Sequence, residues 1–167
     1  MSRLILLRHA ESDRTDGSLF DFDRPLSDRG RRDLPFVAKG LLPFLEENFH
    51  VLCSPALRAK QTFALAESWW PACKIKVIDK LYECGISELV QAVRAIEDKQ
   101  TCAIIIGHNP GLIKFLNWCL ADTEFTTDCY HMPTSTAAVL DFPVVFSEVQ
   151  EGQARLTTYL RAGALMR

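Results

Sequence analysis

The stretch "RLILLRHAES", Arg3–Ser12, decides how the rest of the chain is interpreted. Its four apolar residues, Leu4–Leu7, are typical of a buried strand. They run directly into Arg8 and His9, two side chains that can each bind an anion. A strand that only builds a core would end in an ordinary turn. We therefore expect this strand to carry functional groups at its carboxyl end.

Apolar runs of strand length alternate with longer amphipathic stretches along the chain. This alternation predicts an α/β fold, a three-layer α/β/α sandwich in which helices cover both faces of a mostly parallel sheet. Strands are predicted at Arg3–His9, His50–Ser54, Lys74–Asp79, Cys102–His108, Thr136–Phe142 and Arg155–Arg161.

Helices are expected between these strands, and each has a recognisable start. Ser27 or Asp28 caps the first, which Pro35 should kink or interrupt. Ser54 is expected to cap the second, with Pro55 at its first position. The helices are predicted within residues 27–48, 54–70, 87–99 and 110–122.

Length and composition limit the possible classes. A chain of 167 residues with 48% hydrophobic content suits one domain, residues 1–167. The 19 basic and 21 acidic residues nearly cancel, so we expect no nucleic-acid or membrane partner. The apolar stretch near the N-terminus is too short for a secretory signal or a membrane span, and a cytoplasmic location is expected.

The cysteines argue against a metal site. The chain has six, and no two form a CxxC pair. Several lie in apolar runs, such as Cys53 in "VLCS" and Cys102 in "TCAIIIG", where a thiol behaves as a small apolar group. We expect buried free thiols rather than disulfides or a metal centre.

Three of the predicted strands are followed by groups that bind anions. Arg8 and His9 follow the first, Arg58 lies shortly after the second, and His108 follows the fourth. Because the carboxyl ends of parallel strands share one edge of a sheet, these side chains should converge. They would repel one another unless an anion lay between them. A phosphoryl group fits best, because guanidinium groups match its oxygens with paired hydrogen bonds.

The same segments resemble a known family. "LRHAES", "SPALRAKQT" and "IIGHNPG", in this order, resemble the motifs of the histidine phosphatase superfamily, the phosphoglycerate mutase-like enzymes. The short chain and "RPLSDRG", Arg24–Gly30, are similar to its compact branch of SixA-like phosphohistidine phosphatases. One departure is Ala10, where the family usually has glycine.

The resemblance implies that His9 is the nucleophile of a metal-independent reaction that needs no cofactor. A neutral imidazole can attack phosphorus to form a covalent phosphohistidine, which water then hydrolyses. Arg8, Arg58 and His108, the last if protonated, would hold the phosphoryl oxygens and offset their charge.

The remaining candidate site residues also have ordinary explanations. Glu83, in "KLYECG", is the candidate general acid, or else a surface carboxylate. Arg24 is a candidate substrate-binding residue, although a charge run is more often a solvated helix entry. Ser12 and Asn109 are candidate phosphate contacts, although polar loop residues often bond only the local backbone.

The expected function is a phosphatase acting on a phosphohistidine protein or a small phosphate through a covalent intermediate on His9. Connections that are too short for a cap over the site favour a bulky substrate. Three further functions stay open: a small-molecule phosphomonoesterase, a phosphoglycerate mutase-like phosphotransferase and, from another class, a non-catalytic module that binds phosphorylated partners.

Overall fold

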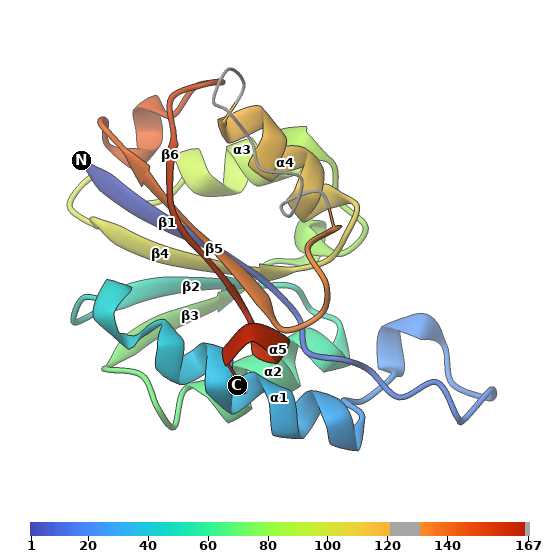
Figure 1. Ribbon diagram of the computed structural model, residues 1–167. Helices are drawn as coiled ribbons and strands as arrows, with labels where there is room; N and C mark the ends of the chain where they lie inside the picture. The colour runs from blue at the N-terminus through green and yellow to red at the C-terminus, as the bar shows by residue number, and fades with distance from the viewer. Residues whose placement is uncertain (121–130, 166–167) are drawn as a thin grey trace.

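A computed structural model of the chain describes residues 1–120 and 131–165. Its centre is a six-stranded sheet in the order β3-β2-β4-β1-β5-β6, between two layers of helices (Figure 1). The predicted α/β class and three-layer arrangement are confirmed. The strands are β1 (Ser2–Arg8), β2 (Phe49–Cys53), β3 (Cys73–Val77), β4 (Cys102–Gly107), β5 (Thr136–Phe142) and β6 (Arg155–Arg161).

All six strands lie within two residues of their predicted bounds, and the sheet is mostly parallel. β1 is central, running parallel to β4 and antiparallel to β5. β2 is parallel to both β4 and β3, while β6 is antiparallel to β5. Four parallel strands, β1 to β4, therefore direct their carboxyl ends to one edge of the sheet.

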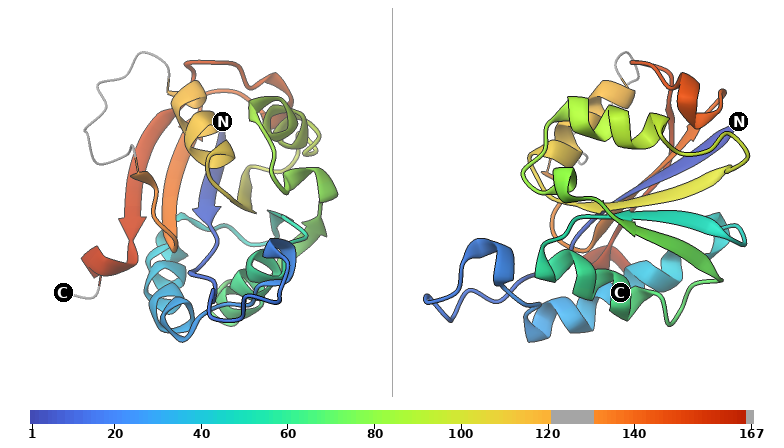
Figure 2. Two further views of the ribbon diagram at one scale, coloured as in Figure 1. Left: turned by 90° about the vertical axis from the view of Figure 1, so that its right-hand side faces the viewer. Right: turned by 180° about the vertical axis from the view of Figure 1, so that it is seen from behind.

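The apolar run of β1 is buried on both faces. Leu4 and Leu6 join the core under α3 (Ile86–Arg94) and α4 (Gly111–Cys119). Ile5 and Leu7 join the core under α1 (Asp28–Gly40), α2 (Leu57–Ala66) and α5 (Ala162–Leu165). The two helical layers lie on opposite sides of the sheet (Figure 2). A continuous apolar run, rather than an alternating one, is what a strand covered on both faces requires.

The helices are shorter than the sequence predicted. Ser27 caps α1 as expected, because its hydroxyl accepts a hydrogen bond from the Gly30 amide at 3.0 Å. Pro35 stays inside α1, which ends at Gly40, and the chain continues as a short 3-10 turn, Leu42–Phe44. The predicted residues 121 and 122 of the fourth helix lie outside the described residues.

The predicted start of α2 is wrong. The helix begins at Leu57, with Ala56 at the capping position and no side-chain cap. Ser54 Oγ instead contacts Nε2 of His108 at 2.7 Å, and only a long 3.4 Å contact links it to the Ala56 amide. The hydroxyl is thus committed mainly to a neighbouring strand end rather than to its own helix.

No helix among the described residues is long and apolar enough to cross a membrane. The cytoplasmic location stays a prediction. Likewise, no group of three or more His, Cys, Asp or Glu side chains in the described part of the chain is arranged to hold a metal ion.

Gly30→Ala tests how closely α1 packs on the segment that follows β1. Alanine normally stabilises a helix interior by about 1 kcal/mol relative to glycine. At Gly30, however, a Cβ would lie 2.3 Å from the Glu11 carbonyl oxygen, a backbone atom. Overpacking costs about 1–3 kcal/mol, so we expect the free energy of unfolding to fall, as measured by urea denaturation.

Gly163→Ala is the matched control in α5, because nothing lies within 4 Å of the added Cβ. Its free energy of unfolding should be unchanged or slightly higher. Gly30→Ala protein as stable as this control would contradict the close approach.

Candidate active site

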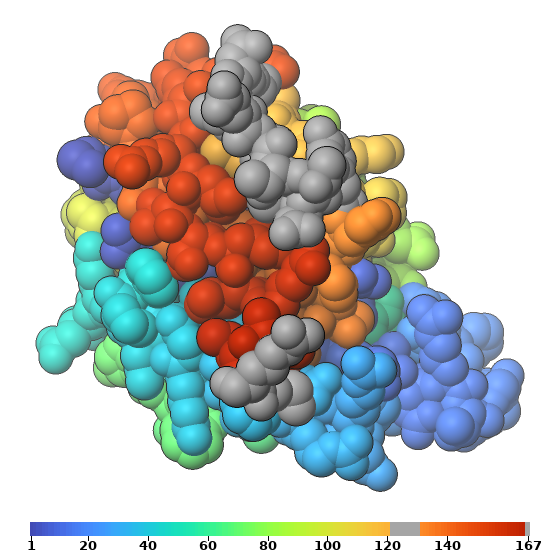
Figure 3. Space-filling model, in the orientation of Figure 1, coloured from blue at the N-terminus to red at the C-terminus, as the bar shows by residue number. Residues whose placement is uncertain are grey.

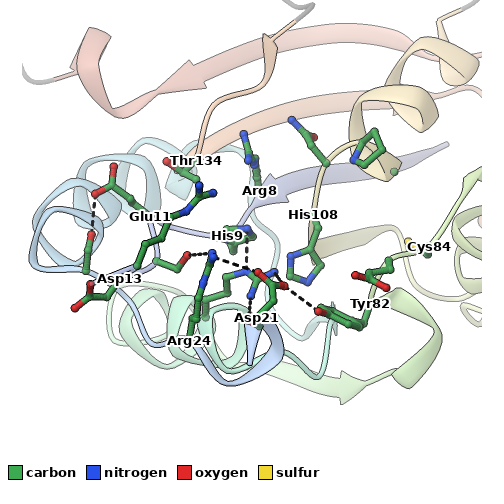
Figure 4. A pocket seen from close by; sticks show the side chains of 18 of the residues that line it. Arg8, His9, Glu11, Asp13, Asp21, Arg24, Tyr82, Cys84, His108 and Thr134 are labelled. Atoms are coloured by element: carbon green, nitrogen blue, oxygen red, sulfur yellow. Dashed lines mark hydrogen bonds and ion pairs between the residues drawn. The ribbon is translucent and has the colours of Figure 1, made fainter. Parts of the chain in front are cut away.

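The carboxyl ends of β1 and β4, together with the first turn of α2, border a cavity of about 1130 Å³. Figure 4 shows the side chains around it converging from strand ends and the segments that follow them. All eight site residues predicted from the sequence line this cavity: Arg8, His9, Ser12, Arg24, Arg58, Glu83, His108 and Asn109. The predicted convergence is therefore observed, while the chemical role of each residue remains a prediction.

His9 is held in one orientation by its own backbone. The side chain is only 6% exposed, and Nδ1 lies 2.7 Å from the Ala10 carbonyl oxygen. A carbonyl only accepts hydrogen bonds, so Nδ1 carries the proton and Nε2 presents a lone pair. Burial first, and then the charges of His108, Arg58 and Arg8, lower the pKa of His9 to about 3, although the Ala10 hydrogen bond raises it. The ring is thus neutral near pH 7, as a nucleophile must be.

Arg58 reaches this lone pair directly. Its Nε donates a hydrogen bond to His9 Nε2 at 3.2 Å. The guanidinium is buried, with 6% of the residue exposed, and it enters the cavity from the first turn of α2. A cation therefore lies directly against the free lone pair of His9.

His108 faces His9 across the cavity, with their ring centroids 4.9 Å apart. Its Nε2 contacts the Ser54 hydroxyl, while Nδ1 is buried without a hydrogen bond to the described residues. Burial, followed by the charge of Arg58, lowers the pKa of His108 to about 4. The condition under which His108 would act as a cation, a protonated ring, is therefore not met near pH 7. A neutral ring that accepts from Ser54 can still donate from Nδ1.

Arg8 approaches from the end of β1. Its Nη1 donates to the Met132 carbonyl at 3.0 Å, and its Nε is buried without a partner among the described residues. Asn109 Nδ2 donates to the same carbonyl at 3.0 Å. Burial, with the charges of Arg14 and Arg58, lowers the pKa of Arg8 from its usual value. Both side chains are thus anchored by one backbone oxygen of the segment before β5.

Thr62 connects the first two motifs. Its hydroxyl accepts a hydrogen bond from the Ala10 amide at 2.9 Å and donates one to the Arg58 carbonyl at 2.6 Å. Ala10 is fully buried at this junction. The alanine that departs from the family pattern is therefore accommodated, with its backbone amide and carbonyl both in use.

The remaining predicted site residues differ in whether their side chains are already hydrogen-bonded. Arg24 Nη2 donates to Ser12 Oγ at 2.6 Å, so these two predicted contacts are bonded to each other. Glu83 is an exposed residue in the cavity wall, with a left-handed backbone at φ 52°. Its side chain makes no hydrogen bond or ion pair to the described residues. The position is compatible with a proton donor and with a surface carboxylate.

Two residues of the site were missed by sequence reasoning. Tyr82 packs its ring edge-on against His108, with centroids 5.6 Å apart, and donates from its hydroxyl to Asp21 at 2.8 Å. Partial burial raises the pKa of Asp21, but the hydrogen bonds from Tyr82 and Arg58 outweigh it and lower that pKa overall. Neither residue belongs to a predicted strand end, although both lie close in sequence to predicted site residues.

Comparison with known proteins agrees with this geometry. Residues 4–109 match the family model of the histidine phosphatase superfamily, branch 1. The chain belongs to the histidine phosphatase superfamily. Membership confirms the predicted enzyme class, a phosphatase. The matched residues contain the first two motifs and the third as far as Asn109.

Individual relatives cover nearly the full length. The uncharacterized Mycobacterium tuberculosis protein Rv1276c is 31% identical over 159 residues, spanning 92% of this chain and 98% of its own. Among solved structures, a candidate phosphohistidine phosphatase SixA from Agrobacterium tumefaciens is 25% identical, with a TM-score of 0.78 over 95% of this chain and 97% of its own. A SixA candidate from Nakamurella multipartitia superposes with a TM-score of 0.82 at 24% identity, covering 96% and 95% of the two chains.

The neutral histidines predict a loss of stability in mild acid. The pKa of His9 is lowered to about 3 and that of His108 to about 4, whereas unfolded histidine titrates near ~6.5. As the pH falls below that value, the two histidines become protonated in the unfolded chain but stay neutral in the folded protein. Proton uptake therefore stabilises the unfolded state. We expect the free energy of unfolding to decrease by about 1–2 kcal/mol for each histidine between pH 7 and pH 5.

Urea denaturation at several pH values measures this slope, and NMR titration of the ring protons assigns it. The His9 signals should not titrate between pH 5 and pH 8. A midpoint near pH 6.5 for His9 would show that the ring is not held neutral.

Proposed function

We propose that the protein hydrolyses phosphate substrates in two steps through a phosphohistidine on His9. The observation that carries this proposal is the buried, neutral ring of His9, whose Nδ1 is bonded to the Ala10 carbonyl and whose Nε2 lone pair faces the Arg58 guanidinium. A nucleophile with a fixed tautomer thus lies beside a cation suited to a phosphoryl oxygen.

In the first step, Nε2 of His9 attacks phosphorus and the bond from phosphorus to the leaving group breaks. The leaving group takes that bonding pair and needs a proton. Once Nε2 has formed its bond to phosphorus, it can no longer accept a hydrogen bond from Arg58 Nε. That N–H is then free to donate to an oxygen of the phosphoryl group now bound to His9. Arg58 can therefore stabilise the negative charge before and after the transfer.

In the second step, water attacks phosphorus and the bond to Nε2 breaks. The electron pair returns to the imidazole, one proton of the attacking water passes to the carboxylate of Glu83 or to solvent, and inorganic phosphate is formed. Arg8 and Arg58 offset the charge of the transferring group, and His108 Nδ1 supplies a further donor. These side chains give the electrostatic stabilisation that a metal ion supplies in other phosphoryl-transfer enzymes.

The substrate class follows from the site and its neighbours. We infer a phosphorylated protein histidine, or a similar small phosphate, because the compact solved relatives are named as SixA phosphohistidine phosphatases. An imidazole leaving group departs with little help, since it is readily protonated. A small-molecule phosphomonoesterase is the second candidate, because Glu83 lines the cavity and could protonate an alkoxide.

A phosphotransferase and a binding module are both less well supported by this site. A phosphoglycerate mutase-like phosphotransferase must keep its phosphoenzyme from water, so comparing phosphate release with transfer to an added acceptor separates it from a hydrolase. A non-catalytic binding module would have no need of a neutral, oriented His9 ring.

His9→Ala should abolish hydrolysis of an aryl phosphate, by at least about 10³-fold, because the covalent route loses its nucleophile. Phosphate release from p-nitrophenyl phosphate measures the loss, and circular dichroism checks the fold. His50→Ala, in β2 and away from the cavity, is the control and should retain turnover. Unchanged turnover in His9→Ala protein would remove the nucleophile assignment.

Glu83→Gln should slow alkyl phosphates about 10- to 100-fold, because an alkoxide needs a proton as it leaves. Phosphoimidazole substrates should be slowed much less. The kcat values for a matched alkyl phosphate and a phosphohistidine peptide measure the difference. Equal slowing of both, or none, would show that another group is the acid.

A further inference from the structure

Asp21 is a half-exposed carboxylate in the wall of a cavity that is lined by several cations. It begins the 3-10 turn Asp21–Asp23, on an arm of residues 13–25 that projects from the body of the molecule (Figure 3). Its Oδ2 accepts hydrogen bonds from Arg58 Nη2 at 2.9 Å and from the Tyr82 hydroxyl at 2.8 Å. Its Oδ1 forms an ion pair with Arg24 Nη1 at 3.3 Å.

The same residue determines how Arg58 is aimed. The Asp21 carbonyl accepts from Arg58 Nη1 at 2.5 Å, in addition to the carboxylate contact with Nη2. Asp21 thus holds both terminal nitrogens of the guanidinium, and only Nε is left to reach His9 Nε2 at 3.2 Å. A free arginine side chain has about 2 kcal/mol of rotamer entropy. Holding the planar fork at two points removes most of that freedom before a substrate arrives.

The charge of Asp21 acts in a second way. A phosphoryl group at His9 would share Arg58 with this carboxylate, and the two anions carry the same sign. Their repulsion opposes part of the attraction from Arg8 and Arg58. The effect is uniform for bound substrate and for inorganic phosphate, so it weakens the hold on the product as well.

We propose that Asp21 is a positioning residue that aims Arg58 at His9 and, as a fixed counter-charge, limits how tightly the site holds inorganic phosphate. The proposal rests on the phosphatase mechanism above and extends it to product release. Without this carboxylate, the cationic site would bind its own product more tightly and turn over less freely.

A purely structural role gives a different expectation. Asp21 also fastens the arm, whose Phe22 ring packs edge-on against Tyr82 with centroids 5.0 Å apart. If fastening were its only role, a substitution would lower stability without changing the affinity for phosphate. The inhibition constant for phosphate therefore separates the two roles.

The experiment compares Asp21→Asn, Asp21→Ala and wild-type protein with p-nitrophenyl phosphate as substrate and inorganic phosphate as inhibitor. Asp21→Asn keeps an oxygen for Arg58 but removes the charge. Its KM and its inhibition constant for phosphate should both fall, by about fivefold or more. This difference from wild type should shrink at high ionic strength, because the repulsion is screened.

Asp21→Ala removes the charge and the Nη2 contact together. We expect the same tighter phosphate binding and, in addition, a kcat about tenfold lower, because Arg58 keeps only the backbone contact of its Nη1 and is aimed less firmly at His9. Asp23→Asn is the matched control, since Asp23 is exposed in the same turn and its side chain makes no hydrogen bond or ion pair to the described residues. Its kinetic constants should match wild type.

An unchanged or higher inhibition constant in Asp21→Asn would overturn the counter-charge. An unchanged kcat in Asp21→Ala would overturn the positioning role. Either result leaves wild-type turnover, and its loss in His9→Ala, untouched. Failure of the proposed phosphatase function would be recognised separately, because wild-type protein would then release no phosphate at all.

Discussion

The site depends on keeping two imidazoles neutral beside two guanidinium groups. Four positive charges at this rim would repel one another strongly, and burial would make each more costly. The structure avoids this by withdrawing His9 and His108 from water, which lowers the pKa of each well below the neutral range. The positive charge of the site then comes from the arginines, while the histidines keep the lone pairs and N–H groups that chemistry needs.

Sheet register is what brings the two rings together. β1 pairs with β4 so that Arg8 lies opposite Gly107, and the next residues along the two strands are His9 and His108. The His9 amide donates to the Gly107 carbonyl at 3.2 Å, which extends the pairing by one residue. Gly107 is buried in β4, directly before His108. The distance between the rings is therefore fixed by backbone hydrogen bonds rather than by a flexible loop.

Much of this architecture could be predicted from the sequence, because it rests on local patterns. Apolar runs located all six strands, and the shared edge of parallel strands predicted that Arg8, His9, Arg58 and His108 would converge. What escaped prediction depends on contacts between distant segments. Ser54 looks like a helix cap in sequence, but its hydroxyl contacts a histidine 54 residues away. Asp21 and Tyr82 are unremarkable until the fold brings the arm across the cavity.

Several polar atoms at the rim remain unpaired, and their cost is informative. Arg8 Nε and His108 Nδ1 are buried without hydrogen-bond partners among the described residues. An unsatisfied buried group costs about 1–3 kcal/mol, so a protein selected for stability alone would pair or remove them. Both are nitrogens, and a phosphoryl oxygen can accept from each. An anion that accepts hydrogen bonds from these two nitrogens would remove the cost of leaving them unpaired, and this gain would favour binding without any rearrangement of the site. Asp21 shows the opposite case, a group whose hydrogen bonds are satisfied but whose charge opposes the ligand. In the proposed mechanism, the balance between these unpaired donors and one well-bonded carboxylate sets how tightly the rim holds a phosphate, and hence how readily it releases one.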